Sequence, residues 1–323
     1  MKLAVLAFAV LAAAFVSLLV GGSVIAPAEV FRSLVHPQAN DVTTIVWQLR
    51  MPRVCAAALV GASLAIGGVL LQGMLRNPLV DPYITGVSAG AAMAIALAIV
   101  AGVAAPVTPA IGFVAGLGTA VLVAALARRG SSVDANRLIL AGISLSALFA
   151  AIVTFTIVRA QSPDYAQQII AWLAGSMAGR GWRDLVYALP YALVGAVLAV
   201  AAIPALNALR VGDVRARAAG VDVDRAQWVI LAASSLLAAS SVALAGIIGF
   251  VGLIVPHLAR RIVGSDARVL LPACAFCGAA LCIIADAVSR SIVAPAELPV
   301  GVLLAFIGVP AFLYLYLRKA TPA

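Results

Sequence analysis

Long apolar runs, separated by short turns and clusters of charge, occupy most of this chain and restrict what it can fold into. The runs lie at residues 3–25, 45–75, 83–102, 107–127, 137–159, 184–206, 227–249, 251–262, 268–290 and 299–317. A helix needs about 20 apolar residues to cross the hydrocarbon core of a bilayer. Because irregular backbone cannot face lipid, the pattern predicts an all-α polytopic membrane protein with about ten transmembrane helices.

The composition supports this class and excludes an ordinary soluble domain. Hydrophobic residues make up 64% of the chain, charged residues make up 10%, and the mean hydropathy is +1.15. The eighth run is too short to cross alone, and it follows Gly246 and Gly249 and contains Pro256. We expect a broken or re-entrant segment there, packed inside the protein. The whole chain, 1–323, is predicted to form a single transmembrane domain.

The charged residues at the ends of the runs predict the orientation. With the N-terminus in the cytoplasm, 14 of the 21 Lys and Arg residues fall at inner ends, which agrees with the positive-inside rule. Both termini are then cytoplasmic. Residues 1–28 also have features of a signal peptide, namely Lys2, an apolar stretch and an Ala26-Pro27-Ala28 end. We expect this segment to be retained, because Pro27 is unfavourable at a cleavage site and its loss would leave an odd number of crossings.

Residues able to carry chemistry are scarce. A phosphate-binding P-loop needs an internal Lys after glycines, and the lysines are Lys2 and Lys319, so another subunit would have to bind and hydrolyse ATP. Cys274, Cys277 and Cys282 share one apolar run without a second pair of ligands, so we predict no metal site. The formal net charge of +9 reflects membrane topology, and we expect no nucleic-acid partner.

One segment departs from the apolar pattern. Residues 207–226 carry seven charged side chains: Arg210, Asp213, Arg215, Arg217, Asp222, Asp224 and Arg225. We expect Asp213 to cap a short helix over 214–219, with Gly220 just beyond its end. We expect Asp224 to cap the next span, with Gln227 as its capping-box partner. Two capped pieces joined at a glycine predict a rigid element suited to binding another protein.

Three long motifs occur in order along the chain. They are LRMPRVCAAALVGASLAIGGVLLQGMLRNPLVDPYITGVSAGAA at 49–92, ALAGIIGFVGLIVPHLARRIVG at 243–264 and ADAVSRSIVAPAELPVGVLLAFIGVPAFLYLYLRK at 285–319. With them the chain resembles, over nearly its whole length, the FecCD-like permeases, the membrane subunits of bacterial ATP-binding-cassette (ABC) importers for iron–siderophore complexes, haem and cobalamin. The resemblance implies the type II ABC importer permease architecture in the inner membrane. It also implies a homodimer, two cytoplasmic ATPase subunits that bind ATP and Mg, and a periplasmic binding protein.

The resemblance assigns a role to arginines on the outer side. Arg50 and Arg53 match outward arginines of the family that receive acidic residues of the binding protein, and Arg290 lies where the family has another. Arg50 and Arg53 flank Pro52 at the start of a span, where cations oppose the helix macrodipole and the positive-inside rule. Snorkelling to lipid headgroups is the alternative explanation. Asp286 precedes Arg290 by four residues and is expected to pair with it inside the membrane.

The same resemblance places the turn at 76–82 beside the inner gate of the translocation path, with Asn77 and Leu79 as candidate gate residues. A tight connection without a transport role explains these residues as well. Segment 207–226 matches the coupling helices of the family, which fit into a groove of the ATPase. The residues implied to make this contact are Asp213, Arg215, Arg217, Gly220, Val221 and Asp222. A well-capped cytoplasmic loop is the alternative.

Two other classes of protein compete with this prediction. An ion-coupled secondary transporter needs ionisable groups inside the membrane, and the runs offer essentially Asp286, with Arg290 as its partner. A membrane-embedded enzyme needs clustered catalytic groups, and the sequence shows no paired carboxylates, Ser-His-Asp pattern or cofactor fingerprint. We therefore predict a transporter subunit with no catalytic residue and no cofactor of its own. For its substrate we place an iron–siderophore complex first, haem second and cobalamin third.

Overall fold

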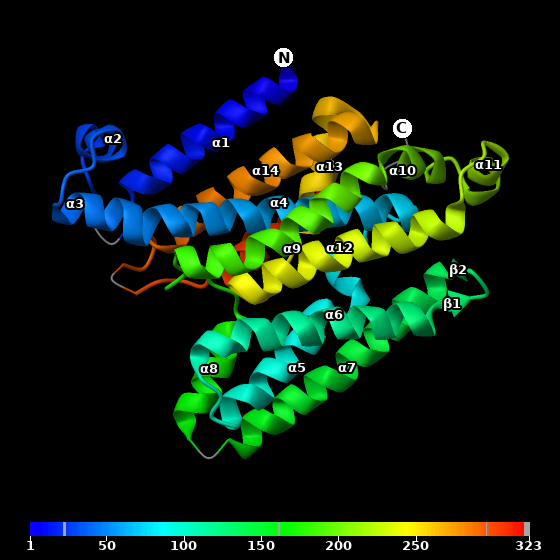
Figure 1. Cartoon of the computed structure of the whole chain (residues 1–323), viewed down its shortest axis with the longest axis horizontal. Coiled ribbons are helices and arrows are strands. Elements are labelled where there is room, and N and C mark those ends of the chain that lie inside the picture. The colour runs from blue at the N-terminus through cyan, green and yellow to red at the C-terminus, as the bar shows by residue number, and fades with distance from the viewer. Residues whose placement is uncertain (22–23, 161, 295, 320–323) are drawn as a thin grey trace.

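The computed structural model places most of the chain in helices (Figure 1). It describes residues 1–21, 24–160, 162–294 and 296–319, and their side chains as far as Tyr314. The elements are α1 (Lys2–Leu19), α2 (Pro27–Val35), α3 (Asp41–Thr44), the π-helical η1 (Ile45–Arg50), α4 (Met51–Leu75), the 3₁₀ turn η2 (Pro82–Thr85), α5 (Val87–Val100), the 3₁₀ turn η3 (Ala105–Val107), α6 (Thr108–Leu126), β1 (Arg128–Arg129), β2 (Ser132–Val133), α7 (Ala135–Arg159), α8 (Pro163–Leu173), α9 (Trp182–Ala201), α10 (Ile203–Leu209), α11 (Asp213–Ala218), α12 (Val223–Ala245), α13 (Val251–Val263), α14 (Ala267–Ser289) and α15 (Val300–Lys319).

The helices confirm the predicted all-α membrane fold. Within the described part of the chain, seven helices are long and apolar enough to cross a membrane, and Val87–Val100 and Val300–Tyr314 are shorter apolar helices. Each predicted run coincides with a helix, although several ends differ. The run at 184–206 is divided between α9 and α10, because Pro204 in the first turn of α10 starts a new helix. The run at 45–75 belongs to a helical stretch that already begins at Asp41.

α4 lies at the centre of the bundle and packs against α14, α12 and α13. Its glycines allow this close approach. A Cβ atom on Gly61 would lie 2.1 Å from the carbonyl oxygen of Gly278 in α14, and one on Gly68 would lie 1.9 Å from that of Gly252 in α13. Small residues let helix backbones touch where lipid supplies no hydrophobic force between helices. The small-residue pattern therefore builds the core.

The predicted break before the eighth run is confirmed. α12 ends at Ala245, and α13 starts only after Gly246 and Phe250, whose φ angles are +71° and +69°. Left-handed backbone cannot continue a right-handed helix, so the chain has to turn. α13 has 13 residues, and its Val251 and Val255 are buried in the bundle.

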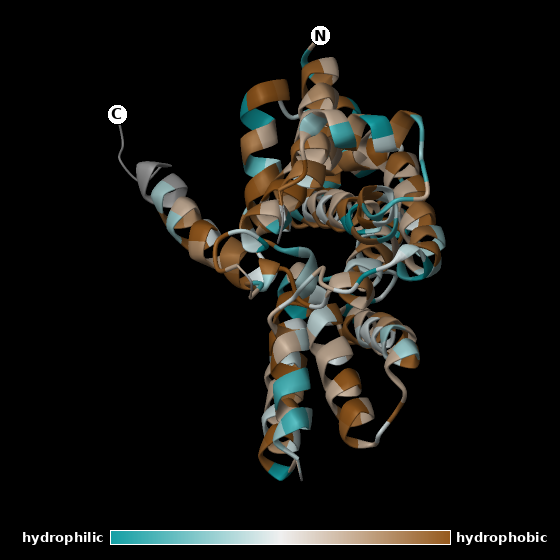
Figure 2. Cartoon of the chain, turned by 90° about the vertical axis from the view of Figure 1, so that its left-hand side faces the viewer, coloured by the Kyte–Doolittle hydropathy of each residue, from teal (hydrophilic) through white to brown (hydrophobic). Residues whose placement is uncertain are grey.

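The two ends of the bundle carry different elements (Figure 1). The "α11 end" holds α10, α11 and the β1–β2 hairpin, in which Arg128 pairs with Val133 and Arg129 with Ser132. The "α2 end" holds α2, α3 and α8. Figure 2 shows that apolar residues predominate on most helices. Between the two ends, Phe8 on α1 and Phe155 on α7 are among the exposed apolar side chains. An apolar belt between two more polar ends is the surface that a bilayer requires.

Candidate functional site

The charged segment 207–226 folds into a compact element at the α11 end. α10 leads into α11, and Gly220 turns the chain toward α12 with a left-handed φ of +82°, which confirms its predicted place after the short helix. Within α11, Ala216 is fully buried in the hydrophobic core, whereas Val214 is 83% exposed and Arg215 is also exposed. The backbone N–H of Val221 donates to the carbonyl of Ala216 at 3.0 Å and closes the turn. The element is therefore fixed underneath and open outward.

The predicted helix caps of this segment are wrong by one or two residues. Gly212, not Asp213, precedes the first turn of α11, because its φ of +108° is open to glycine. Asp222, not Asp224, caps α12 by accepting the backbone N–H of Arg225 at 3.0 Å.

The predicted capping-box partner is wrong as well. The side chain of Gln227 reaches away from its own helix end and accepts the backbone N–H of Val133 in β2 at 2.9 Å. It thereby holds the hairpin against α12.

The acids that do not cap helices tie α11 to its neighbours. Asp213 forms an ion pair of 3.2 Å with Arg76, the residue that ends α4. Asp224 accepts a hydrogen bond from Arg217 at 2.6 Å and another from the hydroxyl of Ser131 in the hairpin. The charged residues of the segment thus connect α4, α11, α12 and the hairpin.

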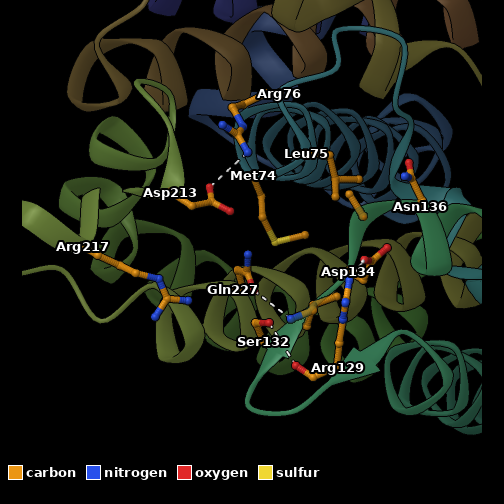
Figure 3. A pocket seen from close by; sticks show the side chains of 12 residues that line it. Met74, Leu75, Arg76, Arg129, Ser132, Asp134, Asn136, Asp213, Arg217 and Gln227 are labelled. Atoms are coloured by element: carbon orange, nitrogen blue, oxygen red, sulfur yellow. Dashed lines mark hydrogen bonds and ion pairs between the residues drawn. The ribbon is translucent and has the colours of Figure 1, made fainter. Parts of the chain in front are cut away.

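A cavity of about 520 Å³ lies between these elements (Figure 3). Figure 3 shows Arg76 and Asp213 facing each other on one side, with Met74 pointing toward the centre. Asp134, on the opposite wall, caps α7. The backbone N–H of Arg137 holds the pKa of Asp134 below its usual range, so this carboxylate stays charged at neutral pH. The cavity is polar and opens at the same end as α11.

The turn at 76–82, here called the corner, starts at Arg76 in the wall of this cavity and leads into η2. Arg76 has a left-handed φ of +53°. The Asn77 side chain accepts the backbone N–H of Leu79 at 2.9 Å, and this turn leaves Leu79 46% exposed. Asp81 caps η2 by accepting the N–H of Tyr83 at 2.9 Å. Asn77 therefore shapes the corner, while Leu79 presents an apolar side chain at the surface; their role in a gate stays a prediction.

Gln72 is a functional candidate that the sequence reasoning missed. Its side chain is 3% exposed, and its amide donates to the carbonyls of Val80 at 3.2 Å and Gly252 at 3.0 Å. Its oxygen accepts a hydrogen bond from Arg260 of α13 at 2.8 Å. These three hydrogen bonds join α4 to the corner and to α13. A lone amide within an apolar run was the signal available in the sequence.

The three arginines predicted to dock a binding protein meet at the α2 end, but their side chains are buried. Arg50, Arg53 and Arg290 are 5%, 8% and 5% exposed. The guanidinium of Arg53 donates to both carboxylate oxygens of Asp286, at 2.9 and 3.0 Å, and to Glu297 at 2.9 Å. Their predicted outward orientation is therefore not observed, because Arg53 and Arg290 bind internal carboxylates and Arg50 donates to a backbone carbonyl of α1.

The predicted pair of Arg290 and Asp286 is confirmed at 3.2 Å. Arg290 also donates to the hydroxyl of Ser17 at 2.7 Å, and Arg50 donates to the carbonyl of Leu18 at 2.6 Å. The cluster consequently fastens the end of α1 to α4 and α14. Glu297 was not predicted, although it is the acid that follows Asp286 in the sequence.

Pro52 lies in the first turn of α4, as predicted, but the helical stretch does not begin there. The helix runs on from α3 through η1 into α4, and the wide π turn at 45–50 accommodates the proline without ending the helix. Arg50 and Arg53 therefore lie within a continuous helix and not at an exposed N-terminus. Exposed arginines at the α2 end include Arg32, Arg159 and Arg183.

Within the described residues, no group of three or more His, Cys, Asp or Glu side chains is arranged to hold a metal ion. Cys274 and Cys282 are buried in α14 and Cys277 is partly buried. The site instead consists of ion pairs and close contacts between helices, together with a short exposed helix. The exposed helix offers a surface for binding another protein.

Comparisons with known proteins show that the chain is similar to membrane transport proteins. A family model described as the FecCD transport family matches residues 9–318. The chain is 42% identical over 276 residues to the cobalamin import system permease protein BtuC of Halobacterium salinarum, covering 84% of this chain and 73% of the relative. It is 37% identical over 296 residues to the hemin transport system permease protein HmuU of Yersinia pestis, covering 90% and 88%.

A solved structure has the same fold. It is an inward-facing conformation of a transporter assigned to the metal-chelate type of ABC transporters. The two chains superpose with a TM-score of 0.87 at 34% sequence identity, and 98% of each chain is covered. The arrangement of helices described above is therefore shared over almost the entire length.

Proposed function

The chain belongs to the FecCD transport family and is a permease of the ABC importers for iron chelates, haem or cobalamin, and we propose that it forms the membrane path of such an importer while a separate subunit hydrolyses ATP. The observation that carries the proposal is the α11 element. A short helix that exposes Val214 and Arg215 and is anchored by Ala216 gives an ATPase a firm surface to push or pull.

The coupling surface consists of α11 and the turn that follows it. Arg215 faces outward, while Asp213 and Arg217 are engaged with Arg76 and Asp224. Gly220 and Asp222 fix the direction in which the chain enters α12, and Val221 closes the turn. A force on α11 would thus pass into α4 and α12 through side chains that already connect them.

A periplasmic binding protein is proposed to dock at the α2 end. Glu297 is 39% exposed and is the outermost partner of Arg53, so an acidic side chain of the binding protein would replace it there. Arg50 and Arg290 lie beneath and keep the cluster positive, since its three arginines outnumber the carboxylates of Asp286 and Glu297.

The permease is proposed to act as a homodimer in the inner membrane. α15 exposes Phe306, Ile307 and Leu313, which gives a second copy an apolar surface to pack against. The path would run between the copies, with Asn77 and Leu79 of the corner at its cytoplasmic gate. Its substrate is proposed to be an iron–siderophore complex, with haem and cobalamin as the other members of the same class of large chelates.

Uptake into lipid vesicles tests the proposal. The permease is reconstituted with its ATPase and binding protein, and ferric siderophore, haem and cobalamin are offered separately. We expect ATP-dependent accumulation of one of them. Gly220→Val should lower the substrate carried per ATP, because a branched side chain is strained at a φ of +82°.

The matched control is Gly102→Val, which has a φ of +71° and equally open surroundings but follows α5. It should carry substrate at the normal ratio. Accumulation that persists without ATP and without the ATPase would contradict the proposal and favour an ion-coupled secondary transporter.

A further inference from the structure

Arg76 occupies an unusual position between the coupling element and the corner. It ends α4 with a φ of +53°, a conformation that residues other than glycine, Asn and Asp seldom adopt. Its guanidinium reaches across to Asp213 at 3.2 Å and lies against Gly212, where an added Cβ would come within 3.4 Å of it. The first turn of α11 is therefore held directly by the residue at which the corner starts.

The far end of the corner is held in a different way. The amide of Gln72 donates to the carbonyl of Val80, and Arg260 binds the oxygen of the same amide. Gln72 is buried, and breaking buried hydrogen bonds leaves polar groups without water. This end of the corner is thus fixed to α4 and α13.

The contact with α11 is easier to break. The side chains of Arg76 and Asp213 are 48% and 37% exposed, so water can replace each partner. An exposed ion pair adds little to stability, but it sets the relative position of the two segments that it joins. The corner therefore has one fixed end and one end that follows α11.

We propose that the ion pair of Arg76 and Asp213 transmits movement of α11 to the corner, with Gln72 and Arg260 as the fixed support. The inference rests on the proposed function of α11 and assigns Arg76, Asp213 and Gln72 as positioning residues of transport. When α11 shifts, the pair draws the start of the corner with it, and Leu79 changes its place relative to Val80, which stays bound to Gln72.

The test compares Arg76→Gln, Asp213→Asn and the exchanged variant Arg76→Asp/Asp213→Arg. In the vesicle assay, each single change should lower the substrate carried per ATP about tenfold, the size of a typical coupling between two sites. The exchanged variant should recover most of the loss, because it restores an ion pair of opposite polarity. Arg268→Gln serves as the control, since it removes an exposed cation from α14 at the same end.

Hydrogen exchange of the permease alone tests the same contact without transport. Both single changes should speed exchange of the backbone N–H groups of Leu79 and Val80, which form the turn with Asn77, and Arg268→Gln should not. If exchange at the corner is unchanged, the contact does not hold it and the inference fails, whether or not uptake occurs. Equal transport ratios in wild type and single variants, or an exchanged variant no better than the single ones, overturn it as well. Absence of ATP-dependent uptake by the wild type contradicts the proposed function instead.

Discussion

Asp286 is enclosed by two guanidinium groups at the α2 end, one from α4 and one from its own helix. Asp286 is 0% exposed, so its carboxylate is stable there only because Arg53 and Arg290 bind it. A proton-coupled transporter would need such a group to be able to lose its partners during each cycle. The double pairing therefore favours a structural role.

Asp286→Asn should destabilise the protein strongly. The change leaves the buried guanidinium group of Arg290 without its carboxylate partner and Arg53 with Glu297 alone, and removing one partner of a buried pair costs about 3–5 kcal/mol of unfolding free energy. Thermal unfolding in detergent measures the effect. Asp41→Asn, which alters an exposed acid at the same end, should leave the unfolding temperature nearly unchanged. A similar unfolding temperature for Asp286→Asn and wild type would show that the cluster contributes no stability.

At the scale of elements, the contact of α4 with α14 depends on two facing glycines. A Cβ on Gly61 would meet the Gly278 carbonyl at 2.1 Å, and one on Gly278 would meet the Gly61 carbonyl at 2.2 Å. Both obstacles are backbone atoms, so the helices themselves would have to separate. The sequence showed the small residues, but the pairing of Gly61 with Gly278 needed the tertiary structure.

Gly61→Ala should therefore destabilise the protein even though alanine favours helices. Overpacking of this kind costs about 1–3 kcal/mol. Gly118→Ala in α6 is the matched control, because nothing lies within 4 Å of its added Cβ, and it should be neutral or slightly stabilising. Chemical unfolding of the two variants side by side gives the comparison, and equal stability would show that α4 and α14 can move apart without cost.

For the whole molecule, the orientation in the membrane follows from the distribution of charge. The α11 end carries the corner, the hairpin and α11, whereas the α2 end carries the buried arginine cluster. We predict that the α11 end and both termini lie in the cytoplasm, as the positive-inside rule and a cytoplasmic ATPase require.

Labelling of single cysteines tests this orientation in a background without the four native cysteines. Gln38→Cys, exposed between α2 and α3, should react with a membrane-impermeant maleimide in intact spheroplasts. Ala219→Cys, exposed after α11, should react only once the membrane is opened. Labelling of Ala219→Cys in intact spheroplasts would reverse the predicted orientation.

The sequence alone determined the membrane class, the order of the apolar helices, the break before α13 and the family, because hydropathy, glycine positions and motifs are local properties of the chain. It did not settle the number of crossings: about ten were predicted, whereas seven helices in the described part of the chain are long and apolar enough to span a membrane and two more are shorter. It placed the charged segment but misassigned its caps, since the side chains of Asp213 and Asp224 are taken by Arg76 and by Arg217 with Ser131, residues of other elements or turns. It also predicted outward arginines that the fold buries, Arg53 and Arg290 against carboxylates and Arg50 against the Leu18 carbonyl. Only the tertiary structure decided the distant partners, because Arg53 and Asp286 lie 233 positions apart in the chain but are adjacent in space.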